Sequence, residues 1–307
     1  MKTHCIIVTY YPNIEHLNKM CTTLLQNSVQ IILVDNSEKN MLHLFSSKEH
    51  ITVLPLHFNS GIAHAQNIGI NKAIKDKANI IVFFDQDSEI TPDFLSTLIT
   101  PIIVNNPMIV SPISVDSKNG SEYPSFKFNK LGLLKKVYGK GKTEPYLVDV
   151  IISSGTAATK EVFEIAGLMD EDFFIDYVDT EWAIRCRKKH IPIQINPLAV
   201  MEHSIGIEDV DMGIIKTTIH SPARTYYKVR NAFLFIRKKN VPFILGIKEI
   251  AAALIHQFAQ LFYVKNKKAY FKSYVSAIYD GITGVKGIKN KTTNENSNNN
   301  RCETAIC

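Results

Sequence analysis

Residues 80–88 read Ile-Ile-Val-Phe-Phe-Asp-Gln-Asp-Ser, an apolar run that stops at two carboxylates, Asp85 and Asp87. A strand this apolar is best buried at the centre of a sheet, so both acids lie at its carboxyl end, where open α/β sheets bind ligands. Because residues two apart on a strand point the same way, both carboxylates can face one crevice. A hard divalent ion carrying a diphosphate would offset their repulsion. Asp and Ser also favour turns, so a strand followed by a turn is the alternative.

The first hundred residues alternate between two hydrophobic periods. Compact β-branched or apolar runs at 4–9, 31–34, 52–56 and 80–84 predict strands, and apolar residues at helical spacing predict helices over 14–25 and from about 59 to 77. A strand, helix, strand order favours parallel pairing with right-handed crossovers. The fold class is therefore α/β, with a mostly parallel central sheet flanked by helices.

Each of these strands delivers a polar group to the same edge of the sheet. Thr9 and Tyr10 lie at the end of the first, Asp35 and Asn36 follow the second, Asn59 follows the third, and the two acids follow the fourth. The crevice at strand carboxyl ends is where nucleotides sit in such sheets. Neither a Gly-x-Gly-x-x-Gly fingerprint nor a Walker lysine loop is present, which argues against dinucleotide redox chemistry and P-loop hydrolysis.

The rest of the sequence predicts further elements and a division of the whole chain into a catalytic domain, an extension and a tail. We expect a helix over 92–104, strands over 109–115 and 148–152, a polar and mobile stretch over 116–142, helices over 160–166 and 179–189, and a strand leading to His203. A catalytic domain then spans 1–215, with nucleotide binding in about 1–115 and acceptor binding and catalysis in about 116–215. An extension covers 216–288, and the Asn-rich tail at 289–307 is predicted to be disordered.

The extension differs from the body in charge. Residues 216–289 hold 14 Lys and Arg against two acidic residues, a net charge of +12, whereas the whole chain carries only +6. A basic extension on an acidic body favours contact with an anionic surface, either a membrane leaflet or nucleic acid. The uncharged run 250–264 is 15 residues long, and a bilayer span needs about 20. We expect this segment to lie on a membrane or to pack as an ordinary helix.

Cysteine usage and the first residues indicate a cytoplasmic protein. Five cysteines are scattered without framework or metal-ligand spacing, as expected for reduced thiols, and no zinc site is implied. The apolar run at 5–8 is too short for a signal-peptide core.

Six motifs, in order along the chain, carry a family resemblance. They are Val-Asp-Asn-Ser at 34–37, Asn-Ser-Gly-Ile-Ala-x-Ala-x-Asn-x-Gly at 59–69, Phe-Asp-Gln-Asp-Ser at 84–88, Ser-Ser-Gly at 153–155, Phe-Phe-Ile-Asp-Tyr-Val-Asp-Thr-Glu-Trp at 173–182, and Arg-x-Tyr-Tyr-x-x-Arg-Asn at 224–231. Over about residues 4–240 the chain resembles family-2 inverting glycosyltransferases of the A-type nucleotide-sugar transferase (GT-A) fold. It is most similar to bacterial rhamnosyltransferases of O-antigen and surface-polysaccharide assembly.

The resemblance implies a role for each matching position. It puts Asp35 against the nucleotide base and Asp85 near the ribose. It puts Asp87, together with His203, on a divalent metal, Mg²⁺ or Mn²⁺. His203 stands 24 residues beyond Asp179, a spacing like that of the metal-binding histidine in several relatives, although a histidine that closes a strand is often only a surface residue. Further nucleotide-binding positions implied by the motifs and strand ends are Thr9, Tyr10, Asn59, Gly61, Asn67, Gln86 and Ser154.

The same resemblance makes Asp179 the general base. Inverting transfer needs one group to take the proton of an acceptor hydroxyl while the nucleotide diphosphate leaves on the opposite face of the sugar. Relatives often carry an acid where this chain has Val178, so Asp176 or Glu181 are alternatives for a share of that work. Asp179 as a helix N-cap is the structural alternative.

The resemblance implies transfer of L-rhamnose from dTDP-L-rhamnose to a hydroxyl of a lipid-linked oligosaccharide at the inner face of the plasma membrane. A UDP-hexose or UDP-galactofuranose donor is the alternative within the same reaction class, because Asp35 would pair with the imide of either thymine or uracil. A catalytically inactive nucleotide-sugar binding protein is the alternative of a different class. Nucleic-acid binding is disfavoured because no recognised motif accompanies the lysines of the extension.

Overall fold

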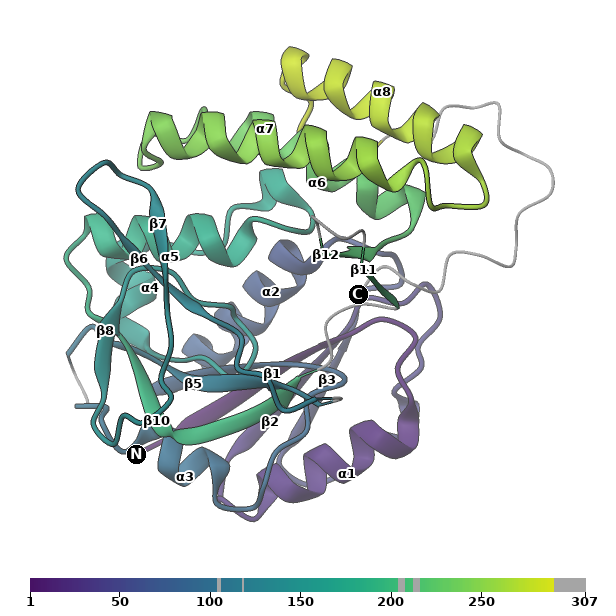
Figure 1. Cartoon of the computed structure of the whole chain (residues 1–307). Coiled ribbons are helices and arrows are strands. Elements are labelled where there is room, and N and C mark those ends of the chain that lie inside the picture. Colours follow the sequence, from purple (N-terminus) through teal and green to yellow (C-terminus); the bar gives the residue numbers. More distant parts are fainter. Residues whose placement is uncertain (104–105, 118, 204–207, 212–215, 290–307) are drawn as a thin grey trace.

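A mixed eight-stranded sheet organises the catalytic part of the chain (Figure 1). The computed structural model describes residues 1–103, 106–117, 119–203, 208–211 and 216–289, and of 203, 208–211 and 216–219 it describes the backbone alone. In spatial order the strands are β3 (Ile51–Pro55), β2 (Gln30–Asp35), β1 (Thr3–Thr9), β4 (Ile80–Asp85), β9 (Ala157–Thr159), β5 (Ile109–Asp116), β10 (Ile193–His203) and β8 (Tyr146–Val148).

The first four strands form the parallel half that the sequence predicts. Helices α1 (Ile14–Leu25) and α2 (Ile62–Lys75) make the crossovers, and a short 3₁₀ helix, η1 (His43–Phe45), precedes β3. In the register of β1, Thr9 is the partner of Asp35 on β2, and Val8 is the partner of Asp85 on β4. The polar strand ends therefore reach the same edge of the sheet.

Strand alternation separates two apolar cores, one on each face of the sheet. Ile6, Ile32 and Ile81 point toward α2, whereas Cys5, Ile31 and Val82 point toward α1. Helices α4 (Lys160–Ala166) and α5 (Val178–Lys188) lie on the α2 side, and α3 (Phe94–Ile99) lies on the α1 side (Figure 1). Burial on both faces explains why these strands are almost continuously apolar.

The second half of the sheet differs from the sequence-based expectation in detail. The short strand β9 runs antiparallel between β4 and β5, which makes the sheet mixed. The strand expected over 148–152 is instead β8, which ends at residue 148 and pairs antiparallel with β10. The expected helix over 92–104 is shortened to α3, and part of the polar stretch 116–142 forms a hairpin of β6 (Ser125–Phe128) and β7 (Leu134–Val137).

The C-terminal helices pack against the catalytic part and do not project from it (Figure 1). After the β11 (Glu208–Asp211) and β12 (Lys216–Ile219) hairpin come α6 (Pro222–Phe235), α7 (Phe243–Gln260) and α8 (Lys267–Thr283). Leu245 joins the core on the α2 side. No helix in the described part of the chain is long and apolar enough to cross a membrane. The division at residue 215 stays a prediction, and residues 290–307 of the predicted tail lie outside the described residues.

Candidate active site

Thr9 and Asp35 meet where the first two strands end. The Thr9 hydroxyl donates a 3.4 Å hydrogen bond to Asp35 Oδ1. Asp35 is fully buried, and its carboxylate also accepts the backbone N–H groups of Ser37 at 3.1 Å and Met41 at 2.8 Å. The carboxylate thus fixes the turn that follows β2, and its contact with a nucleotide base stays a prediction.

Gln86 joins the ends of β1 and β4. The N–H of Tyr10 donates to Gln86 Oε1 at 2.7 Å, and Gln86 Nε2 donates to the Tyr10 carbonyl at 3.2 Å. Strand β4 ends at Asp85, where the N–H of Ser88 closes a turn on the Asp85 carbonyl. Strand and turn are therefore both present: Asp85 is half-buried at the strand end, and Asp87 is exposed in the turn beyond it.

Asn36 ties β2 to the loop that opens α2. Its Oδ1 accepts the N–H and the hydroxyl of Ser60 at 2.7 and 2.8 Å, and its Nδ2 donates to Asn59 Oδ1 at 3.1 Å. Asn59 Oδ1 in turn accepts the N–H of Gly61 at 3.1 Å. The predicted residues Asn59 and Gly61 are thereby held at the edge where β2 ends.

The Ser153-Ser154 pair connects this edge to Asp179. Ser154 Oγ accepts the N–H of Asp85 at 3.1 Å and lies 2.9 Å from the Ser88 hydroxyl. The N–H of Ser153 donates to Asp179 Oδ2 at 3.3 Å. Residues of the predicted nucleotide-binding edge and the predicted base therefore belong to one connected site.

Asp179 has the environment of a general base. It lies in the first turn of α5, but the N-cap of that helix is Tyr177, so Asp179 is not the cap residue. Its Oδ1 accepts the N–H of Thr180 at 2.7 Å. Burial raises the pKa of the Asp179 carboxyl above its usual value and nearby Asp176 adds to the rise, while hydrogen bonds from Thr180 and Ser153 act in the opposite direction. A carboxylate with a raised pKa is the better acceptor for a hydroxyl proton.

The two alternative acids are both committed to cations. Glu181 is buried and forms an ion pair with Arg185, with Oε2 and Nη2 2.8 Å apart. Asp176 forms an ion pair with Arg224 at 3.2 Å, and although burial opposes ionisation, Arg224 holds the pKa of Asp176 below its usual value. A lowered pKa makes Asp176 a weaker base, and the ion pair with Arg185 engages Glu181. The role of Asp179 as the general base stays a prediction.

The loop before α5 is held in strained backbone conformations. Phe174, Asp176 and Tyr177 have φ of +44°, +61° and +66°, values that non-glycine residues rarely adopt. The fully buried Asn231 of α6 donates from Nδ2 to the carbonyls of Phe173, Ile175 and Asp176 at 3.1, 2.6 and 3.3 Å. Helix α6 therefore stabilises the loop that leads into the helix of the candidate base.

Gly61 is required by a close approach to the same loop. It has φ +85°, and a Cβ there would lie 2.6 Å from both the ring and the carbonyl oxygen of Phe174. The N–H of Ile62 donates to that carbonyl at 2.7 Å. Gly61 thus allows the start of α2 to contact the loop before α5, and its contact with a nucleotide stays a prediction.

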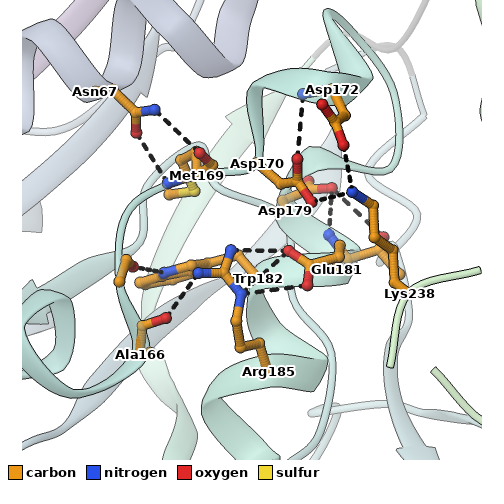
Figure 2. A network of polar contacts seen from close by, with 12 residues as sticks. Asn67, Ala166, Met169, Asp170, Asp172, Asp179, Glu181, Trp182, Arg185 and Lys238 are labelled. Carbon is orange, nitrogen blue, oxygen red and sulfur yellow. Dashed lines mark hydrogen bonds and ion pairs between the residues drawn. The ribbon is translucent and has the colours of Figure 1, made fainter. Parts of the chain in front are cut away.

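A second polar network supports residues 166–172 (Figure 2). Asn67 donates to the carbonyl of Met169 at 3.0 Å and accepts its N–H at 2.8 Å. Lys238, three residues after the end of α6, lies within 2.7 Å of carboxylate oxygens of both Asp170 and Asp172. The Asn67 side chain is buried and both ends of its carboxamide are engaged by the backbone of Met169. Its contact with a nucleotide stays a prediction.

The candidate metal ligands Asp87 and His203 lie just after β4 and at the end of β10. An isolated antiparallel bridge, with the N–H of Glu89 donating to the carbonyl of Glu202 at 3.4 Å, brings the segment after Asp87 beside the segment before His203. The His203 side chain lies outside the described residues, and among the described side chains no three acidic, His or Cys groups converge. Mg²⁺ is usually bound through one or two carboxylates plus substrate phosphates, so Asp85 and exposed Asp87 fit such an ion.

Two residues of this site were missed from the sequence, Ser153 and Asn231, and Asn36 was expected at the strand end without a specific role. Each acts through hydrogen bonds to or from the backbone of a segment distant in the chain. Their only sequence signal is membership of the motifs at 34–37, 153–155 and 224–231.

Sequence similarity to other proteins extends over most of the chain. A family model described as glycosyl transferase family 2 matches residues 5–164. The chain is 41% identical over 285 residues to the dTDP-rhamnosyl transferase RfbF of Shigella flexneri, covering 92% of this chain and 96% of that protein. It is 26% identical over 236 residues to the low-salt glycan biosynthesis hexosyltransferase Agl10 of Haloferax volcanii, covering 75% and 74%.

Solved structures share the fold. The crystal structure of GalNAc-T7 with UDP, GalNAc and Mn²⁺ superposes with a TM-score of 0.59 at 16% identity, over 93% of this chain and 58% of that one. The S. aureus TarS 1-349 structure in complex with UDP-GlcNAc gives 0.55 at 15% identity, over 93% and 82%. The predicted A-type nucleotide-sugar transferase fold is confirmed. Since the family model covers more than half of the sequence and one relative matches nearly all of it, the chain belongs to glycosyl transferase family 2 and is a glycosyltransferase.

Proposed function

We propose that this glycosyltransferase transfers L-rhamnose from dTDP-L-rhamnose to a hydroxyl of a lipid-linked oligosaccharide, with inversion at the anomeric carbon. The observation that carries the donor assignment is the 41% identity, over nearly the whole chain, to a dTDP-rhamnosyl transferase. The observation that carries the mechanism is Asp179, an acid of raised pKa joined through Ser153 and Ser154 to the strand end at Asp85.

In this mechanism Asp179 accepts the proton of the acceptor hydroxyl as its oxygen attacks the anomeric carbon. The bond from that carbon to the diphosphate oxygen breaks on the opposite face, and dTDP leaves with the electron pair. Asp87, with His203, would hold a divalent ion that offsets the charge of the diphosphate, and Asp85 would lie near the ribose. Thr9, Tyr10 and Gln86 would line the nucleotide side of the crevice, where their contacts fix the loops after β1 and β4.

The test is dTDP release by the purified full chain with dTDP-L-rhamnose, Mg²⁺ and a lipid-linked acceptor. Turnover should disappear in Asp179→Asn and persist in Asp176→Asn, and the product should have the anomeric configuration opposite to that of the donor. A parallel screen with a UDP-hexose and UDP-galactofuranose tests the donor, because several structural neighbours were solved with UDP or a UDP sugar. Nucleotide binding without turnover on any donor would support the inactive binding protein instead.

We also propose that α7 and α8 contact the inner, anionic face of the plasma membrane, where a lipid-linked acceptor is found. Phe258, Phe262 and Phe271 are about half exposed or more, at 48%, 67% and 54% of their surface. Exposed Lys265 and Lys267 lie between α7 and α8 or at the start of α8. Aromatic side chains next to lysines suit the headgroup region of an anionic leaflet.

Flotation with phosphatidylglycerol vesicles tests this contact. Because Leu245 of α7 belongs to the core, removal of residues 242–288 would disrupt the fold, and exposed positions are the better target. The double variant Phe262→Ser and Lys267→Gln should lose flotation and keep its unfolding transition. Unchanged flotation, or binding of duplex DNA in preference to vesicles, would contradict the membrane proposal.

A further inference from the structure

The β6–β7 hairpin and the residues just after it are strongly basic. Residues 127–142 hold six lysines and no acidic residue. All six are exposed: Lys127, Lys130, Lys135, Lys136, Lys140 and Lys142. In the register of the hairpin, Lys127 and Lys135 are cross-strand partners. Like charges directly opposite one another destabilise a strand pair, so an anion bound there would stabilise the hairpin.

The acids that contact this hairpin are engaged by other donors. Asp149 accepts the N–H of Phe128 at 2.7 Å and forms an ion pair with Arg187, with Oδ1 and Nε 2.7 Å apart. Glu122 accepts the N–H groups of residues 139–140. Among the side chains that the structure describes, neither carboxylate forms an ion pair with one of the six lysines. The lysines therefore form a positive surface.

The turn of the hairpin presents an apolar tip. Asn129 Oδ1 accepts the N–H groups of Leu131 and Leu133 at 2.9 and 3.0 Å, and the N–H of Asn129 donates to the Leu133 carbonyl at 2.8 Å. These bonds fix the turn with 70% of the Leu131 surface exposed. Leu134 instead packs against the core on the α2 side. An exposed leucine among lysines suits the headgroup region of a lipid leaflet.

The turn packs on the start of α7 (Figure 1). A Cβ on Gly132 would lie 3.2 Å from Cβ of Pro242 and 3.6 Å from Cγ2 of Ile244. Exposed apolar side chains then follow along and just beyond α7 at intervals of three or four residues: Phe243, Ile247, Ala251, Ile255, Phe258 and Phe262. This stripe connects the hairpin to the phenylalanines of the membrane contact proposed above, over about 27 Å of helix.

We propose that the β6–β7 hairpin is a second contact with an anionic lipid leaflet, at the opposite end of α7 from Phe262. Leu131 would enter the boundary between headgroups and acyl chains, and the lysines would pair with phosphate groups. A leaflet is favoured over a nucleic acid because a leucine has no π-face on which a base could stack. The inference rests on the membrane contact proposed for α7 and α8 and extends it along the length of α7.

The hairpin is also connected to the candidate active site. The N–H of Phe126 donates to the Val150 carbonyl at 3.2 Å, and the N–H of Asp149 donates to the Phe126 carbonyl at 2.8 Å. Val150 lies three residues before Ser153, whose N–H donates to Asp179. A leaflet bound by the hairpin would therefore have a fixed position relative to the segment that contacts the proposed base.

The charge is tested by flotation of the full chain with phosphatidylglycerol vesicles, which needs neither donor nor acceptor. Lys127→Gln combined with Lys135→Gln removes the cross-strand pair. The matched control is Lys19→Gln combined with Lys75→Gln, at exposed positions on α1 and α2, which changes the net charge equally. Each lysine near an anionic leaflet contributes about fivefold in binding, so the hairpin variant should bind at least about tenfold more weakly than its control. Without lipid it should unfold no more easily than wild type, because the repulsion is removed.

The apolar tip is tested in the same assay. Leu131→Ser should weaken binding by about tenfold, because less apolar surface is buried in the leaflet. Leu44→Ser on η1, where the leucine is 59% exposed, is the matched control.

Losses for both hairpin variants, with binding retained by both controls, support the proposal. Equal binding by either hairpin variant and its control overturns it. If Phe262→Ser with Lys267→Gln still loses flotation in that case, the contact of α7 and α8 stands alone. A wild type that does not float overturns both membrane contacts and leaves the transferase assignment untouched. Preferential binding of duplex DNA, lost in the lysine variant, would assign the hairpin to a nucleic acid and would also overturn the proposal.

Discussion

Asn231 provides a quantitative test of how the C-terminal helices support catalysis. Its side chain is fully buried, donates to three carbonyls of the loop before α5, and accepts from Arg230 Nε and Nη2 at 2.9 and 2.7 Å. In Asn231→Ala the short 2.6 Å bond to the Ile175 carbonyl is lost and part of the Arg230 guanidinium has no acceptor. Each buried group left unpaired costs about 1–3 kcal/mol, so we expect unfolding to become easier by about 3 kcal/mol.

The same variant should reduce turnover more than nucleotide binding. The loop has three residues at positive φ, so without Asn231 it can relax toward ordinary conformations and displace the helix that carries Asp179. A displacement of about 1 Å of a reacting group costs about 100-fold in rate. Nucleotide affinity should change less, because the contacts of Thr9, Gln86 and Asp35 at the strand ends do not involve α6.

Urea unfolding followed by circular dichroism measures the first effect, and kcat and KM for the donor separate the second. Asn18→Ala, at an exposed position on α1, is the control for loss of a carboxamide. If Asn231→Ala stays within about 1 kcal/mol of that control and retains its kcat, the argument that α6 holds the loop is refuted.

Three further predictions concern the site directly. Gly61→Ala should destabilise the fold by about 2–4 kcal/mol in thermal unfolding, because it combines strain at φ +85° with a contact on Phe174; Gly141→Ala, with φ +82° and open space, should show the strain alone. Asp179→Asn should lower kcat by at least about 100-fold. Because the base must be ionised and burial raises its pKa, wild-type kcat should fall with decreasing pH at values above the ordinary aspartate range. Asp87→Ala should remove the dependence of dTDP affinity on Mg²⁺ in calorimetry, and an unchanged dependence would contradict its role as a ligand.

The parallel half of the fold and its polar edge could be predicted because each signal is local. An apolar run followed by Asp35, or by Asp85, contains both the buried strand and the group it delivers. The short strands could not be predicted in this way. Strand β9 has three residues, and its place between β4 and β5 depends on pairing with segments about 50 to 80 residues away, which leaves no periodicity to detect.

Acidic residues of the candidate site could be proposed from the sequence. Residues that contribute by hydrogen bonds to or from the backbone could not. Asp179 stands in a recognisable acidic segment, whereas Ser153 contributes its N–H, which every residue but proline has. Asn67 and Gly61 were predicted as nucleotide-binding positions because their motif is shared with the family. The structure gives both a positioning role toward residues 169–174, and sequence alone does not distinguish contact with a ligand from contact with the segment that binds it.

These positioning contacts explain why the basic extension and the catalytic loop must fold together. Asn231 and Arg230 of α6 and Lys238 just after it all contact residues 170–176. Arg230 and Lys238 do so through Asp172. The loop carries strained residues, and the carbonyls of Phe173, Ile175 and Asp176 accept from Asn231, so we expect its shape to depend on these partners. A surface contact that shifts α7 or α8 is then transmitted to α6, which packs with both helices around Phe174 and Ile175. The membrane contact proposed for α7 and α8 would therefore be connected to the positioning of the proposed base through one small apolar core.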